Sequence, residues 1–262
     1  MLSLYLKGVS LIAPGLKNWQ TAQQVLTGID DYQYCVVDKK LSTFLPPNEN
    51  RRCSRTTQLA LSAIQQLLTH YPFNPHKIRY IFSSCNGDLN IFHHISQALT
   101  QVNRPVSPIK FHNSVHNAPA GYGAIVLQSQ QASTSITAYQ DSFACGLLEA
   151  SVQSLSNQQD CLFCAYDEIP PERLSSLVPI IDDFSYALLL SSDHEQAIAR
   201  LDISITKGKM ISTMNNKALE QLRQSNPQAK ILPLLHAIAN KQNTTLYFDN
   251  NQQQIAIQVN KL

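Results

Sequence analysis

Charged side chains are scarce in this sequence. Only 15% of its 262 residues are Asp, Glu, Lys or Arg, and the formal net charge is +2. This balance gives neither the basic field that nucleic acid attracts nor the acidic tail of a chaperone-like protein. Gln, Asn, Ser and Thr must supply most of the polar surface. A weakly charged surface of this kind suits a protein that is largely covered by another subunit.

Long apolar runs are also absent. No stretch is long enough to cross a bilayer, and the opening MLSLYLKGVSLIAP has neither the positive segment nor the cleavage site of a signal peptide. We therefore expect a cytoplasmic protein without membrane insertion. Hydrophobic residues still make up 44% of the chain, which is enough for a sizeable core. Because no linker or low-complexity segment interrupts the sequence, we expect one domain over residues 1–262.

The cysteines follow no regular spacing. They are Cys35, Cys53, Cys85, Cys145, Cys161 and Cys164. A chain of this size needs no disulfides for stability, so we interpret them as reduced thiols. Cys161 and Cys164 form a CxxC, but a second pair of metal ligands is missing and both lie in a predicted buried strand. We therefore expect no metal and no cofactor.

Two other short motifs have ordinary interpretations. His93 and His94 are adjacent, so on a helix their side chains point about 100° apart and do not readily bind one ion. The segment Lys207–Gly208–Lys209 lacks the Gly-rich loop and the hydroxyl residue of a phosphate-binding motif. We interpret it as a turn.

Hydrophobic periodicity predicts alternating strands and helices. The predicted strands cover residues 2–12, 78–84, 135–139, 161–168 and 184–192, and the predicted helices cover 19–26, 56–68, 90–102 and 142–155. A turn is predicted at the PFNP segment, 72–75. The region 201–262 should add a strand, two short helices and two closing strands at 245–250 and 253–259. Strands that alternate with helices predict an α/β fold.

One segment has the form of a nucleophile-bearing turn. SITAYQDSFACGLLEA contains a strand, a sharp turn and a helix, which can present a reactive side chain at a helix N-terminus. The turn carries Gln140, and a glutamine cannot attack an acyl carbonyl. Ser142 and Cys145 are alternatives, although they should point from other faces of the helix.

At this point the sequence resembles the β-ketoacyl synthase family, from its N-terminus to about Ile205. KGVSLIAPG resembles the opening strand and turn of the family, IRYIFSSCNGDLN a later strand and Gly-rich turn, and HNSVHNAPAGYGAI the dimer-interface segment. SITAYQDSFACGLLEA matches, without a gap, the family segment that carries the active cysteine in a Thr-Ala-Cys context. The spacing from Asn117 and Gly121 also fits, so the resemblance places Gln140 at the nucleophile position.

The resemblance implies a thiolase-like (ketosynthase) fold, an α/β fold layered αβαβα, with a truncated C-terminal half. Residues 1–205 would form the N-terminal repeat and 206–262 a reduced C-terminal repeat. The two catalytic histidines and the Gly-Phe-rich oxyanion segment of ketosynthases find no match here. His236, the only histidine after His194, lies in an apolar helix and is interpreted as a core or surface residue.

A glutamine in place of the nucleophile resembles the chain length factors of type II polyketide synthases, and among them the truncated subunits of aryl polyene pathways. The resemblance thus implies a pseudoenzyme without catalytic residues, which pairs with an active ketosynthase and shapes the tunnel for an acyl chain carried by acyl carrier protein. The implied dimer edge strand consists of Ser133, Thr134, Ser135, Ile136, Thr137 and Ala138. The residues expected near the tunnel or interface are Val115, His116, Asn117, Tyr139, Gln140 and Phe143, and ordinary interface packing is an equally open interpretation of them.

Two alternatives remain open. The chain could be a stand-alone acyltransferase or decarboxylase whose nucleophile is Cys145 or Ser142. It could also be a scaffold that binds the carrier protein without affecting chain length.

Overall fold

The computed structural model describes residues 1–41, 43–71 and 73–262. The strands are β1 (Leu2–Ile12), β2 (Arg79–Ser83), β3 (Ser133–Ile136), β4 (Cys161–Asp167), β5 (Phe184–Ser191), β6 (Ala199–Thr206), β7 (Thr244–Asn250) and β8 (Gln253–Lys261). The α-helices are α1 (Trp19–Leu26), α2 (Pro47–Asn50), α3 (Arg55–His70), α4 (Leu89–Leu99), α5 (Pro108–Asn113), α6 (Ala118–Val126), α7 (Ser142–Asn157), α8 (Lys217–Gln224) and α9 (Leu232–Ala239). Short 3₁₀ turns are η1 (Tyr139–Asp141), η2 (Glu172–Leu174) and η3 (Pro227–Ile231).

Each predicted strand and helix is present, with some ends shifted by a few residues, whereas α2, α5 and α6 were not predicted. The predicted strand at 135–139 is displaced most, because the chain leaves the sheet after Ile136 and forms a 3₁₀ turn at Tyr139. The C-terminal pattern of one strand, two short helices and two closing strands is also confirmed. Of the predicted turn at 72–75, residue 72 lies outside the described residues.

All of these strands form one sheet in the order β3-β2-β4-β5-β1-β6-β8-β7. β2 is parallel to both β3 and β4, whereas β5 runs antiparallel to β4 and β1. β4 and β5 are buried along their whole length. Both faces of these two strands must therefore be covered, which explains why their sequences are continuously apolar rather than alternating.

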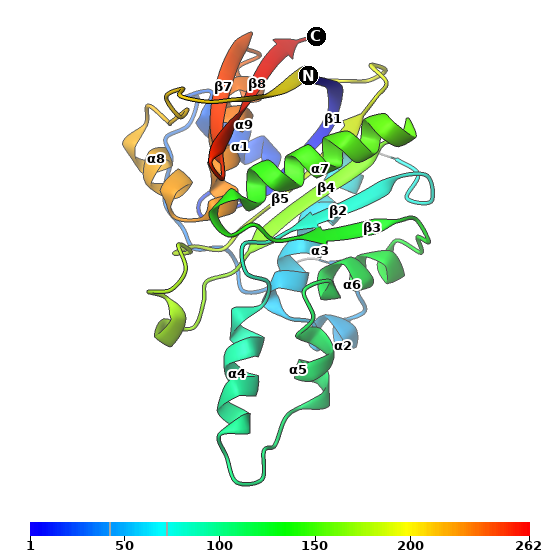
Figure 1. Ribbon diagram of the computed structural model, residues 1–262, viewed down its shortest axis with the longest axis vertical. Coiled ribbons are helices and arrows are strands. Elements are labelled where there is room, and N and C mark those ends of the chain that lie inside the picture. The colour runs from blue at the N-terminus through cyan, green and yellow to red at the C-terminus, as the bar shows by residue number, and fades with distance from the viewer. Residues whose placement is uncertain (42, 72) are drawn as a thin grey trace.

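Helices cover the two faces of the sheet (Figure 1). α3 and α6 lie on one face, where Leu59, Ile64 and Leu67 of α3 join a core with alternate residues of β2 and β4. α7 lies on the other face, and its residues Leu147 and Ala150 belong to the larger core. The sheet is therefore enclosed by helices on both sides in its central part.

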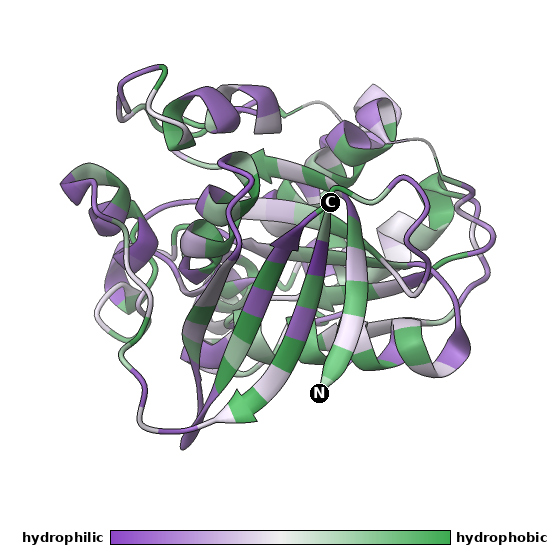
Figure 2. Cartoon of the chain, turned by 90° about the horizontal axis from the view of Figure 1, so that it is seen from above, coloured by the Kyte–Doolittle hydropathy of each residue, from purple (hydrophilic) through white to green (hydrophobic). Residues whose placement is uncertain are grey.

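The C-terminal strands β7 and β8 fold back over α7 and α9. The sheet thus curves around α7, which contacts both β2 and β7. The outer face of β7 and β8 is exposed, as at the cross-strand pair Thr245 and Gln258. Figure 2 shows the matching alternation of hydrophobic and hydrophilic residues along the strands near the two termini.

A helical lobe formed by α4 and α5 projects from the body of the molecule (Figure 1). Its surface carries large apolar side chains at Phe92, Leu99 and Phe111, and Phe111 is 66% exposed. Ile125 on the neighbouring helix α6 is 71% exposed. An exposed group of this kind is typical of a surface that contacts another protein. None of the described helices is long and apolar enough to cross a membrane.

Candidate functional site

The candidate site is the turn between β3 and α7. The parallel strands β2, β3 and β4 all end at this edge of the sheet, and α7 starts directly after the turn at Ser142. Tyr139 adopts a φ of +52°, a left-handed conformation that is uncommon for a residue with a side chain. Strained backbone of this type is frequent at functional sites. The structure therefore contains the strand, sharp turn and helix expected from the sequence.

Ser142 holds this turn together from within. Its hydroxyl Oγ accepts a hydrogen bond from the Ala138 amide at 2.9 Å. The same hydroxyl can donate to the carbonyl oxygen of Tyr139, at 2.8 Å, or to that of Ser84, at 3.3 Å. Ser142 is fully buried. The hydroxyl is thus used to close the turn, and its position does not support the alternative in which Ser142 is a relocated nucleophile.

Asp167, at the end of β4, binds the segment that follows β2 and lies next to the turn. Its Oδ1 accepts hydrogen bonds of 2.8 Å from the Ser84 hydroxyl and from the Cys85 amide. Thr137 next to the turn donates in turn to the carbonyl oxygen of Cys85 at 2.7 Å. Burial raises the pKa of Asp167 to about 7, against the opposing effect of these hydrogen bonds. The sequence analysis did not single out Asp167, although an acidic residue closing an otherwise apolar strand was a visible signal.

The C-terminal part of the chain reaches the turn through Lys230. The ammonium Nζ of Lys230 donates a hydrogen bond of 2.7 Å to the main-chain oxygen of Gln140. A cavity of about 350 Å³ opens beside this contact. Its lining includes Gln140, Pro179, Ile211, Arg223, Lys230 and Asp249. Sequence reasoning missed Lys230 because nothing in the spacing links two residues so far apart along the chain.

The residues expected near the tunnel or interface do not all share one environment. Val115, Asn117, Tyr139 and Gln140 are exposed. His116 is half-buried, with Nε2 3.1 Å from the carbonyl oxygen of Ile136 at the end of β3. These residues thus lie around the carboxyl end of the edge strand.

Phe143 departs from one part of its expectation, a place on the interface with a partner subunit. It is only 1% exposed and packs edge-on against Phe248 of β7, with ring centroids 5.1 Å apart. The second residue of α7 faces the core under the returning C-terminal strands, so Phe143 cannot face a partner subunit. The edge-strand expectation also needs adjustment, since β3 ends at Ile136 and leaves Thr137 and Ala138 in the turn.

The turn offers two positions for the family nucleophile. Gln140 is the residue placed there by the ungapped match, but the left-handed φ belongs to Tyr139, which also follows the Thr-Ala pair directly. Tyr139 is 46% exposed, and its hydroxyl donates to the carbonyl oxygen of Leu177 at 3.3 Å. Neither residue is a cysteine.

Cys145 lies one helical turn after Ser142 in α7 and is half-buried. Its thiol donates to Oδ1 of Asn250 at 3.2 Å, and burial, assisted by the charge of Asp141, raises its pKa. An activated cysteine needs the opposite shift. Burial likewise raises the pKa values of Cys161 and Cys164 in β4, as expected for structural cysteines.

Metal-binding arrangements are absent from the described part of the chain, where no three His, Cys, Asp or Glu side chains are placed to hold an ion. The rings of His93 and His94 lie 6.3 Å apart, and the Nδ1 atom of His94 contacts the carbonyl oxygen of Asn90 on its own helix. Burial lowers the pKa of His236, which lines a small separate cavity near Thr213. Gly208 has a φ of +68°, consistent with the turn expected at Lys207–Lys209.

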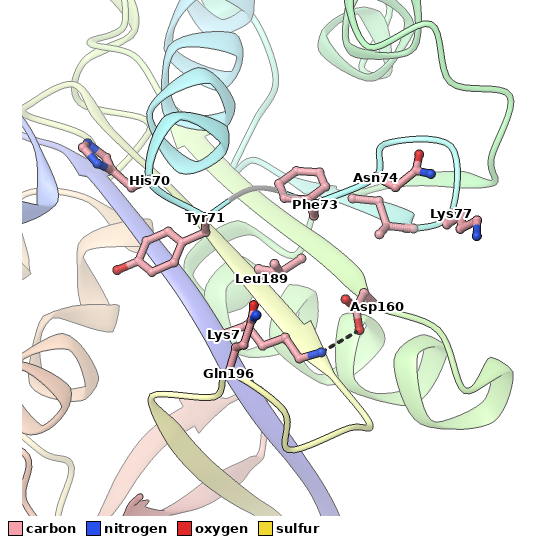
Figure 3. A pocket seen from close by; sticks show the side chains of 10 residues that line it. Lys7, His70, Tyr71, Phe73, Asn74, Lys77, Asp160, Leu189 and Gln196 are labelled. Carbon is pink, nitrogen blue, oxygen red and sulfur yellow. Dashed lines mark ion pairs between the residues drawn. The ribbon is translucent and has the colours of Figure 1, made fainter.

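A second cavity of about 360 Å³ lies at the opposite end of the parallel strands (Figure 3). Lys7 is an extra residue in β1, because the pairing with β5 skips from Leu6 to Gly8. Its ammonium lies 3.6 Å from Asp160 and 3.8 Å from Asp193. Asp160 precedes β4 while Asp167 ends it, so this cavity is separate from the turn at Gln140.

The topology, the turn and the helix that follows it define a thiolase-like α/β protein. The family model of the β-ketoacyl synthase N-terminal domain matches residues 18–254. The chain therefore belongs to the β-ketoacyl synthase family. This match begins after β1 and extends well beyond Ile205, where the sequence analysis placed the end of the resemblance.

Solved structures of similar fold include several ketosynthase complexes. A chain of the ketosynthase ApeO in complex with its chain length factor ApeC, from Xenorhabdus doucetiae, is 23% identical with a TM-score of 0.75, over 98% of this chain and 100% of that chain. The ishigamide ketosynthase/chain length factor is 13% identical with a TM-score of 0.74, over 100% of both chains. A chain of AntDE:AntF, a type II PKS acyl-carrier protein in complex with its ketosynthase, is 10% identical with a TM-score of 0.76, over 100% of this chain and 99% of that chain. No curated protein matches the chain significantly.

Proposed function

We propose that this chain is a non-catalytic, chain-length-factor-like subunit. It pairs with an active ketosynthase and completes the acyl tunnel in which a carrier-protein-bound polyene or polyketide chain is elongated. The proposal depends above all on one observation: the turn that presents the nucleophile in this family is fully formed, yet Tyr139 and Gln140 occupy it and neither bears a thiol. Without a thiolate the subunit cannot hold the acyl group.

The surroundings of the turn support this interpretation. Decarboxylation of a malonyl group in ketosynthases depends on histidines, whereas the described residues around the cavity at Gln140 include no histidine. That cavity is lined instead by amides, apolar side chains and the charged groups of Arg223, Lys230 and Asp249. The solved structures of similar fold include complexes of a ketosynthase with a chain length factor, which is the partnership proposed for this chain.

The surface beside the turn is suited to a partner subunit. Within the described sheet β3 pairs only with β2, so its outer edge is open for further strand pairing. Ile125 is exposed on α6, which contacts β3, and Val115 and Phe111 are exposed on the segment before α6. A ketosynthase that joined its own edge strand to β3 would cover them, and Tyr139 and Gln140 would then lie close to its acyl tunnel.

The experiment is co-expression with a candidate ketosynthase from the same organism, followed by mass spectrometry of the intact complex after incubation with acyl and malonyl carrier protein. We expect a one-to-one complex with acylation confined to the ketosynthase. An acyl adduct on this chain would instead favour the stand-alone enzyme with a relocated nucleophile. A complex whose product length does not depend on this chain would favour the scaffold.

A further inference from the structure

Lys230 connects the C-terminal region to the turn. It belongs to η3, and its Nζ donates 2.7 Å to the main-chain oxygen of Gln140, ninety residues earlier in the sequence. The donor is charged and the side chain is half-buried. A hydrogen bond from a charged donor is about twice as strong as one between neutral groups. The peptide group of Gln140 is thereby held from the side of the C-terminal region.

The charges around Lys230 suit this role. Burial lowers its pKa most, and Arg223 lowers it further. The carboxylates of Asp141 and Asp249 act in the opposite direction and favour the ammonium form. The C-terminal region and the turn each contribute one of these acids, so the ammonium is placed between the two parts of the chain that it joins.

A second contact holds the turn from the same C-terminal side. The amide of Asn251, in the turn between β7 and β8, donates to Oδ2 of Asp141 at 2.9 Å. Gln140 and Asp141 are therefore both held from the C-terminal side, while Ser142 closes the turn from the inside. The side chains of Tyr139 and Gln140 remain exposed. With the main chain fixed, the directions of these side chains are fixed as well: Tyr139 reaches the carbonyl oxygen of Leu177, and Gln140 lines the cavity beside Lys230.

We propose that Lys230 is a positioning residue that sets the direction in which Tyr139 and Gln140 face the partner subunit, and thereby the length of acyl chain that the complex makes. The inference rests on the function proposed above. Without the ammonium, the Gln140 carbonyl loses its fixed partner and the peptide can rotate. Rotation would redirect both side chains without removing either of them.

The test compares Lys230→Met, which keeps the aliphatic stem but removes the charge and donors, with Lys230→Arg, which restores both. Lys217→Met is the matched control, because Lys217 is an exposed lysine at the start of α8. Amide hydrogen exchange over residues 138–142 is measured in the complex with the ketosynthase. We expect exchange there to be roughly ten-fold faster in Lys230→Met, the order expected for one lost charged hydrogen bond.

Product length is the second measurement, made on the same complexes with malonyl carrier protein as extender. We expect a shifted length distribution in Lys230→Met and a return towards the original in Lys230→Arg. If Lys230→Met fails to assemble, Lys230→Gln, which keeps an amide donor, replaces it in both measurements.

Unchanged exchange at 138–142 would overturn the positioning role whatever the complex produces. Faster exchange with an unaltered product distribution would overturn the link to chain length. The proposed function fails separately, if the ketosynthase makes the same products without this chain. The exchange measurement on Lys230 can still be interpreted in that case, because it reports the conformation of the turn and does not depend on which products are made.

Discussion

The ring of Phe143 lies edge-on to the ring of Phe248, with their centroids 5.1 Å apart. Phe143 belongs to the helix that follows the candidate turn, and Phe248 belongs to the C-terminal strand β7. Both are almost fully buried. Aromatic pairs in this arrangement stabilise a core beyond the area that they bury. We therefore propose that the region after residue 206 folds as one unit with the preceding part.

The substitution Phe248→Ala tests this coupling. We expect the free energy of unfolding to fall by roughly 3–5 kcal/mol, the usual cost of deleting a buried phenylalanine ring. Thr245→Ala on the exposed face of the same strand is the control and should have little effect. Urea unfolding is followed by the fluorescence of Trp19, the single tryptophan, and by circular dichroism. One shared transition is expected, and two separate transitions would contradict a single cooperative unit.

Asp167 should make stability depend on pH. Its pKa is raised from 3.8 to about 7 by burial, so the folded protein binds this proton more tightly than the unfolded chain does. The unfolding free energy should therefore fall as pH rises through the window from about 4 to about 7, by up to about 4 kcal/mol. Below that window the protonated Asp167 makes its full contribution to the unfolding free energy.

Asp167→Asn removes this titration while keeping an oxygen that can accept from Ser84 and Cys85. We expect the variant to be more stable than the original protein near pH 8, and the difference to disappear below about pH 4. Thermal unfolding at the two pH values measures this. Parallel pH profiles of the two proteins would show that Asp167 does not carry the proton, since other buried acids such as Glu168 are common to both.

Gly146 allows α7 to lie close to the sheet. A Cβ atom added there would lie 2.6 Å from Cε2 of Phe163 and 3.0 Å from Cβ of Ser83. Gly146→Ala should therefore push the helix away from β2 and β4, at a cost of roughly 1–3 kcal/mol in unfolding free energy.

Gly121→Ala provides a matched control, because an added Cβ at Gly121 in α6 meets no atom within 4 Å. Its unfolding free energy should stay the same or rise by about 0.4–1 kcal/mol, since alanine favours the helix. Equal losses in the two variants, measured by urea unfolding, would mean that close packing at Gly146 is not the reason for glycine there.

Much of the fold could be predicted from the sequence because burial leaves a local signal. FSYALLLSS is continuously apolar, and β5 is covered on both faces. The periodic Leu59, Ile64 and Leu67 predicted α3 and its buried side. The end of β3 was less predictable, because Thr137 and Ala138 suit a strand as well as a turn. The hydrogen bonds of Thr137 to Cys85 and of Ala138 to Ser142 favour the turn, and those bonds depend on the tertiary structure.

The site was predictable only in part, for the same reason. The absence of a cysteine in the turn could be read from the residues alone. The contact of Lys230 with Gln140 and that of Asp167 with Ser84 join distant segments, so no local pattern announces them. The burial of Phe143 was not predictable, because the sequence does not show that β7 returns over α7.

Cysteine reactivity provides the last prediction, directed at the alternative of a relocated nucleophile. Cys35 is exposed, whereas Cys145 is half-buried and burial raises its thiol pKa. Because alkylation requires the thiolate, iodoacetamide near neutral pH should modify Cys35 well before Cys145, with Cys85, Cys161 and Cys164 protected until the protein unfolds. Mass spectrometry of timed samples measures the order, and labelling in denaturant confirms that every cysteine can react. If Cys145 instead reacted faster than Cys35, its environment would have to favour the thiolate. The proposed accessory role would then give way to acyl transfer by this chain itself.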